Sequence, residues 1–153
     1  MNIGKIQQEV LKALLVDPKN VKCTGFGDES VLITIDHTVS WALKQSWLRI
    51  DLDGTQNLID YLPCTEHVVH PDNVLRPTDE YRLGGCARRY LRTDTVDEDD
   101  VYIDTARLKF FDHPTLYQSP GFPHLIFVTE DICQNGETVV VGIVTPVKVD
   151  TEN

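Results

Sequence analysis

The chain has 153 residues, of which 41% are hydrophobic and 25% are charged. That composition is globular and excludes a disordered chain, and the length favours a single domain spanning residues 1–153. The net charge of −10 disfavours a general nucleic-acid-binding role, because such binding relies on Lys and Arg displacing counterions. Most of the excess lies in residues 94–153, which carry twelve acidic and three basic groups.

The cysteines and the N-terminus indicate a cytoplasmic protein. The four cysteines lie at positions 23, 64, 86 and 133, so the sequence contains no CxxC motif. Polar residues interrupt the N-terminal apolar pattern, which excludes a signal peptide, and no run reaches the roughly 18 apolar residues of a membrane span. We therefore expect reduced thiols and no membrane contact, with two disulfides as the alternative for a secreted protein.

Residues 3–16 have the pattern of an amphipathic helix. Ile3, Ile6, Val10 and Leu14 follow one another at offsets of three and four, which places them on one stripe. We expect Asn2 to cap the helix and the pair 17–18, Asp-Pro, to end it, because proline disfavours helical backbone in the residue before it.

The next fifty residues predict strands and a long loop. The segments 20–26, 30–36 and 39–50 read as three strands, with Trp41 and Trp47 as core or partly buried anchors. A short helix is expected at 55–61, followed by an irregular stretch over 62–80 that contains three prolines.

The second half of the chain predicts further strands and one short helix. Segment 81–93 reads as a strand with a bulge or bend at the pair 84–85, Gly-Gly. Residues 101–104 predict a strand that enters a helix at 105–111, with Asp104 as its N-cap. Segments 124–129 and 138–149 form a strand pair around a tight Asn-Gly turn at 135–136. Pro146 predicts an edge or a bulge in the last strand, because proline has no N–H to donate.

These elements predict an α+β fold: a mostly antiparallel sheet of six to eight strands with the helices at 3–16 and 105–111 packed on one face. The expected core consists of eleven apolar residues from these elements. They are Ile6, Val10, Leu14, Leu32, Ile33, Trp41, Leu108, Ile126, Val128, Val141 and Ile143.

A search for chemical motifs gives no catalytic, cofactor or metal site. The sequence has no GxSxG motif and no phosphate-binding glycine loop. Cys64, Glu66, His67 and His70 form a dense group of metal-ligand types, but no second ligand pair follows at a standard zinc spacing. We interpret this group as polar loop residues and expect no enzyme activity.

Arginines cluster with tyrosines in residues 81–92 of this otherwise acidic chain. On a regular strand Arg82, Arg88 and Arg92 would share a face and Arg89 would point the other way, unless the glycine pair changes the alternation. Such a group can bind phosphates or stack on bases, or it can form ion pairs with the acidic run at 97–100 within the chain. That run comprises Asp97, Glu98, Asp99 and Asp100, and both groups are our candidate binding residues.

The last third of the chain resembles the final domain of DNA sliding clamps. Segments 101–111, 123–127 and 142–149 match, in order, a strand with a short helix, a strand beginning near a proline, and an apolar-Pro-apolar-basic-apolar ending. The resemblance implies a non-enzymatic fold that assembles from several chains, since a ring needs six such domains. It also implies basic side chains towards DNA, as Arg88 and Arg92 would provide.

Three hypotheses for function follow from the sequence. The first is a non-enzymatic interaction protein, since small acidic chains of this kind resemble proteins of phages and mobile elements. It would bind a protein partner, with DNA as a second partner through the arginines, and it could form an oligomer. The second is an acidic inhibitor whose carboxylates at 94 and 97–100, near Glu130 and Asp131, imitate nucleic-acid phosphates. The third is an unrecognised metal protein or enzyme built on Cys64, His67 and His70.

Overall fold

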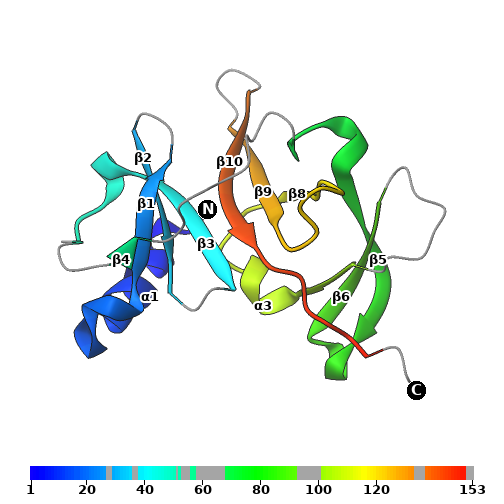
Figure 1. Ribbon diagram of the computed structural model, residues 1–153, viewed down its shortest axis with the longest axis horizontal. Coiled ribbons are helices and arrows are strands. Elements are labelled where there is room, and N and C mark those ends of the chain that lie inside the picture. The colour runs from blue at the N-terminus through cyan, green and yellow to red at the C-terminus, as the bar shows by residue number, and fades with distance from the viewer. Residues whose placement is uncertain are drawn as a thin grey trace.

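The computed structural model shows a curved sheet with one long helix beside it (Figure 1). The residues that it describes are 1–26, 29–35, 38–50, 52, 56–57, 68–92, 101–132 and 137–150.

In the described part of the chain, ten strands form one sheet in the order β4-β1-β2-β3-β10-β9-β8-β5-β6-β7. The strands are β1 (Lys22–Phe26), β2 (Ser30–Thr34), β3 (Val39–Lys44), β4 (Gln56–Asn57), β5 (Val74–Arg82), β6 (Ala87–Arg92), β7 (Val101–Asp104), β8 (Thr115–Tyr117), β9 (Ile126–Ile132) and β10 (Glu137–Val144). The helices are α1 (Ile3–Val16) and α3 (Thr105–Leu108), with 3-10 turns at Pro18–Asn20, Gln45–Trp47, Pro71–Asn73 and Leu83–Gly85.

The predicted α+β class is confirmed. The pair β1–β4 is parallel, and every other strand pair within the described residues is antiparallel. The sheet is larger than the six to eight strands predicted, because no strand was predicted for β4, for β8 or for most of β5.

Helix α1 forms as predicted. The side chain of Asn2 accepts a hydrogen bond from the Lys5 backbone N–H at 3.0 Å, which satisfies one of the free N–H groups of the first turn. The helix ends at Val16, because Asp17 takes extended backbone before Pro18. Ile6 and Val10 are fully buried, while Leu15 is 79% exposed, so only one stripe of the helix packs on the sheet.

The core divides into two clusters because successive side chains of a strand point to opposite faces of the sheet. The larger cluster contains Ile33 and Trp41 together with the buried stripe of α1. The smaller cluster contains Leu32 and Phe127. Nine of the eleven predicted core residues are buried. The other two, Leu14 and Leu108, are half-buried and pack against the larger cluster, so α1 and α3 cover the same face.

One half of the sheet curls back on itself. Tyr102 of β7 forms a bridge with Val147, which follows β10, and the Val147 backbone N–H donates to the Tyr102 carbonyl at 2.8 Å. Because β7 and β10 are the two ends of the run β10-β9-β8-β5-β6-β7, this bridge brings the run round almost to a barrel. Figure 1 shows this curved part on the right, with α3 at its lower end.

Several predicted boundaries in the first half of the chain are wrong. The strand predicted at 39–50 stops at Lys44, and a 3-10 turn then leaves Trp47 38% exposed. Gln56 and Asn57 form β4 beside β1 instead of part of a helix at 55–61, whose other residues lie outside the described ranges.

The irregular stretch predicted at 62–80 ends in a nine-residue strand, β5. Its pairing with β6 is interrupted between Pro77 and Tyr81, as expected where a proline lacks an N–H. Pro77 therefore marks an irregular strand rather than a loop, whereas Pro71 begins the 3-10 turn before that strand and Pro63 lies outside the described residues.

The last third of the chain follows its prediction more closely. Asp104 caps α3, accepting from the Ala106 N–H at 2.9 Å, but the helix ends at Leu108 instead of 111 and the buried Phe110 and Phe111 follow it. β9 and β10 pair as predicted, although their Asn-Gly turn lies outside the described residues. β10 ends at Val144, before Pro146, and its bulge lies between Val140 and Gly142 instead.

No helix in the described ranges is both long enough and apolar enough to cross a lipid bilayer.

Candidate functional site

The arginine group lies on a β-hairpin formed by β5 and β6. The 3-10 turn Leu83–Gly85 joins the two strands, and both of its glycines have positive φ, 67° at Gly84 and 92° at Gly85. That backbone suits glycine because it has no Cβ to clash. The glycine pair therefore reverses the chain between two strands, where the sequence predicted a bend within one.

The hairpin register separates the arginines onto two faces. Tyr81 lies opposite Arg88, and the Arg88 guanidinium lies 5.6 Å from the centre of the Tyr81 ring, so these two side chains share a face. Arg82 lies opposite Ala87 and therefore shares the other face with Arg89. The prediction that Arg82 joins Arg88 and Arg92 is wrong, because the turn resets the alternation.

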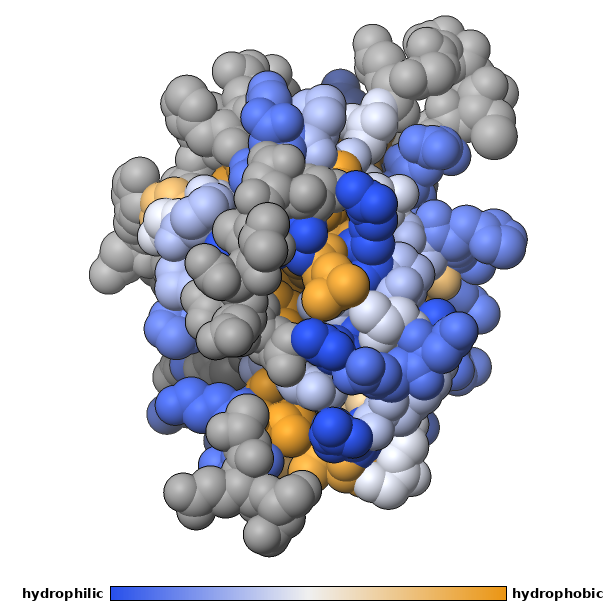
Figure 2. All heavy atoms as spheres, turned by 90° about the vertical axis from the view of Figure 1, so that its right-hand side faces the viewer, coloured by the Kyte–Doolittle hydropathy of each residue, from blue (hydrophilic) through white to orange (hydrophobic). Residues whose placement is uncertain are grey.

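We call one side of the hairpin the outer hairpin face and define it by Arg76, Arg82, Arg89 and Leu91. Arg76 lies opposite Leu91, which is 45% exposed, and Arg89 forms an ion pair with Glu80 at 2.8 Å. Figure 2, which views the molecule from the right of Figure 1, shows strongly hydrophilic residues around exposed hydrophobic ones. Arg76 was missed from the sequence because its segment read as a loop; its alternation with Leu75 was the available signal.

The opposite side of β6 carries Arg88 and Arg92. The Arg88 Nε–H donates to the Thr78 carbonyl at 2.7 Å, and a terminal nitrogen of Arg88 lies 3.8 Å from the fully exposed Asp79 carboxylate. Arg92 donates twice to the Gln118 side-chain oxygen, at 3.0 and 2.6 Å, and Gln118 is 3% exposed. Arg92 is therefore a structural residue that orders a buried amide.

The predicted pairing of the arginines with the acidic run cannot be followed, because Asp97, Glu98, Asp99 and Asp100 lie outside the described residues. Within the described ranges, Arg88 and Arg89 pair with carboxylates of their own hairpin. The arginines thus do not form a single patch on one face of the hairpin.

A cavity of about 380 Å³ lies on the Arg88 side of the hairpin, and we call it the hairpin cavity. Among the described residues, the charged ones that line it are Arg88 and Lys109, and burial raises the pKa of the lining residue Tyr90. The remaining lining residues are Leu75, Pro77, Thr105, Leu108, Pro114 and Leu116.

A second cavity, of about 330 Å³, lies between α1, β3 and α3. Trp41 lines it, and the buried indole N–H of Trp41 finds no hydrogen-bond partner among the described residues. Its charged lining residues have mixed signs, and two are already engaged: Asp104 caps α3, and Arg107 donates to the Thr145 carbonyl at 2.6 Å. This cavity therefore has no net charge preference.

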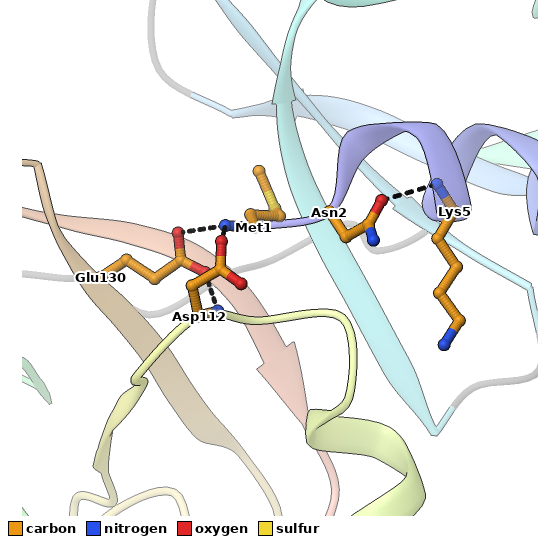
Figure 3. Close-up of polar contacts among 5 residues, drawn as sticks. All are labelled: Met1, Asn2, Lys5, Asp112 and Glu130. Atoms are coloured by element: carbon orange, nitrogen blue, oxygen red, sulfur yellow. Dashed lines mark hydrogen bonds and ion pairs between the residues drawn. The ribbon is translucent and has the colours of Figure 1, made fainter.

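An ion-pair cluster forms around the N-terminal amine (Figure 3). The Met1 amine donates to Asp112 and, at 2.9 Å, to Glu130, whose other oxygen accepts from the Asp112 backbone N–H at 2.7 Å. Burial lowers the pKa of the amine, but its hydrogen bonds and charge interactions with Asp112 and Glu130 outweigh burial and leave that pKa raised. Glu130 is thus engaged within the chain, while the acidic row that the phosphate-mimic hypothesis places near it lies outside the described residues.

Within the described residues, no three His, Cys, Asp or Glu side chains come together as a metal site. His70 lies 3.2 Å from Asp72, while Cys64, Glu66 and His67 lie outside those residues. Of the described cysteines, Cys23 is half-buried and Cys86 is exposed.

Comparisons with known proteins give no relative: no protein-family model, curated protein or solved structure matches the chain. The sliding-clamp resemblance and the phage-like character therefore stay predictions.

Proposed function

We propose that this chain is a non-enzymatic interaction protein that binds an acidic segment of a protein partner through the outer hairpin face. The observation that carries the proposal is that Arg76, Arg82 and Arg89 lie on the same face of two adjacent strands as the half-exposed Leu91.

The charge of this face differs from that of the whole chain. Three arginines and one glutamate, Glu80, lie on it, in a protein whose net charge is −10. Glu80 engages Arg89, and no ion pair of Arg76 or Arg82 is found among the described residues. Two arginines thus stay available to carboxylates, which arginine binds through paired hydrogen bonds.

The composition of the face favours a protein over DNA. Arginines around an exposed apolar side chain are typical of binding hot spots at protein interfaces. DNA binding would require neutralising many phosphates, and the negative field of the rest of the chain opposes the approach of a polyanion. We therefore propose DNA only as an alternative outcome of the test.

Photo-crosslinking from Leu91, the exposed apolar residue of the face, tests the proposal. The variant Leu91→p-benzoylphenylalanine is irradiated in lysate of the cells that naturally express the chain, and cross-linked peptides are sequenced. We expect a cross-link to a polypeptide segment rich in Asp and Glu, and we expect it to disappear when Arg82→Glu is added.

The matched control is Leu15→p-benzoylphenylalanine on α1, where the replaced leucine is 79% exposed and lies away from the hairpin. The same acidic segment captured equally from position 15 would overturn the proposal. So would a cross-link that survives Arg82→Glu, and a cross-link to nucleic acid would favour the DNA alternative.

A further inference from the structure

The hairpin cavity combines an apolar lining with charge of one sign. Leu75, Leu108 and Leu116 contribute aliphatic surface from β5, α3 and β8. Arg88 of β6 and Lys109, which follows α3, supply the charge, and both are cations. In a chain with a net charge of −10, the cationic lining that the described residues provide is the reverse of the average surface.

The Arg88 guanidinium is held in place without being neutralised. Its Nε–H is fixed by the Thr78 carbonyl at 2.7 Å, and it lies 5.6 Å from the Tyr81 ring. The carboxylate near it, on Asp79, is fully exposed and 3.8 Å away, so water screens most of that attraction. The terminal nitrogens of Arg88 therefore keep N–H donors for a ligand. Because the side chain is already held in place, binding would lose little side-chain conformational entropy.

Lys109 and Tyr90 add donors to the same cavity. The Lys109 ammonium lies 5.2 Å from the centre of the Phe110 ring, and no ion pair of Lys109 is found among the described residues. Tyr90 also lines the cavity, and its phenol, which is protonated at neutral pH, can donate a hydrogen bond.

We propose that the hairpin cavity binds a small organic carboxylate, with its apolar body among Leu75, Leu108 and Leu116 and its carboxylate at Arg88 and Lys109. The cavity volume of about 380 Å³ lies within the range of small-molecule sites, which combine an apolar lining with a few polar groups. Arg88 thus serves this cavity, on the opposite side of β6 from the outer hairpin face.

Calorimetric titration of the purified chain with octanoate tests this proposal independently of any protein partner. We expect one-to-one binding with a Kd on the order of 100 μM, as the efficiency of small ligands suggests. We expect 1-octanol and inorganic phosphate each to bind at least about tenfold more weakly than octanoate. 1-Octanol lacks the carboxylate that would contact Arg88 and Lys109, and phosphate lacks the chain that would contact the leucines.

Three variants locate the binding. Arg88→Met and Lys109→Met remove one cation each, from β6 and from the residue after α3, and each should weaken octanoate binding about tenfold. Arg76→Met changes the same residue type on the outer hairpin face and should leave the affinity within about twofold. Circular dichroism verifies that each variant is folded. If Arg88→Met does not fold, the affinity of Lys109→Met for octanoate tests the proposal.

Four results would overturn the proposal: no saturable octanoate binding, equal binding of octanol, equal binding of phosphate, or an equal loss in Arg76→Met and the two cavity variants. None of them bears on the protein-binding proposal, because that test uses different residues and no small ligand.

Discussion

The indole of Trp41 and the ring of Phe110 meet edge to face, with ring centres 5.0 Å apart and planes inclined at 72°. Trp41 is in β3, and Phe110 lies just after α3, 69 positions later in the sequence. This contact therefore joins the N-terminal part of the sheet to its curled half. Both residues are buried in the larger cluster. The pair therefore couples the packing of the two halves.

Replacing Phe110 tests that coupling. Phe110→Leu removes the edge-to-face contact while keeping much of the apolar volume, so we expect the free energy of unfolding to fall by about 1.5 kcal/mol. Urea denaturation measures the change, with Tyr81→Leu as an exposed aromatic control that should stay within about 0.5 kcal/mol. Equal effects of the two substitutions would show that the contact contributes nothing specific.

Gly142 is required by the close approach of β3 and Phe111 to β10. A Cβ built there would lie 2.5 Å from the Ser40 carbonyl oxygen and 2.6 Å from the Phe111 ring. Because backbone atoms cannot move aside cheaply, we expect Gly142→Ala to cost about 3 kcal/mol of unfolding free energy. At Gly25, where a Cβ meets nothing within 4 Å, the same change should cost less than about 0.5 kcal/mol. Thermal unfolding that ranks the two variants the other way would contradict the packing described here.

Arg92 has a structural role that separates it from the other arginines. Arg92→Met leaves the Gln118 side-chain oxygen buried without its two donors, so we expect a loss of about 2 kcal/mol in urea denaturation. Arg76→Met, on the exposed face, should change stability by less than about 0.5 kcal/mol. A loss in Arg92→Met no larger than in Arg76→Met would show that the buried amide finds other donors.

The ion pairs of the Met1 amine predict a pH dependence of stability. Because folding raises the amine pKa above its ordinary 8.0, this contribution is complete below pH 8 and is lost as the pH rises through the folded value. The hydrogen bond from the amine lowers the pKa of Asp112 below 3.8, so the contribution of Asp112 is present above pH 3.8 and is lost in stronger acid.

The corresponding experiment compares unfolding free energies between pH 7 and pH 10. The unmodified chain should lose stability over this range, and Glu130→Gln should lose less, because one partner of the amine has been neutralised. Asp131→Asn, next in the sequence and exposed, should retain the full slope. Parallel slopes for all three proteins would refute this linkage.

The sequence predicted what depends on local pattern and missed what depends on strand pairing. The stripe of Ile6 and Val10 and the caps Asn2 and Asp104 are local signals, and these predictions are confirmed. The irregular pairing of β5 hid a strand behind Pro77. Because β5 was read as a loop, the site was only half predicted: Arg76 was absent, and Arg82 was assigned to the wrong face. The register of the two strands around Gly84 and Gly85 decides which side of the hairpin each arginine faces. Alternation along a single strand cannot predict that register, because the turn restarts it.

The division of the arginines between two faces is tested most directly by one matched pair across the hairpin turn. The acidic segment found by cross-linking is titrated, as a labelled peptide, against Arg82→Ala and Arg88→Ala, and its anisotropy is measured. We expect Arg82→Ala to weaken peptide binding about tenfold and Arg88→Ala to leave it within about twofold, because only Arg82 lies on the outer hairpin face. A loss confined to Arg88→Ala would contradict the account.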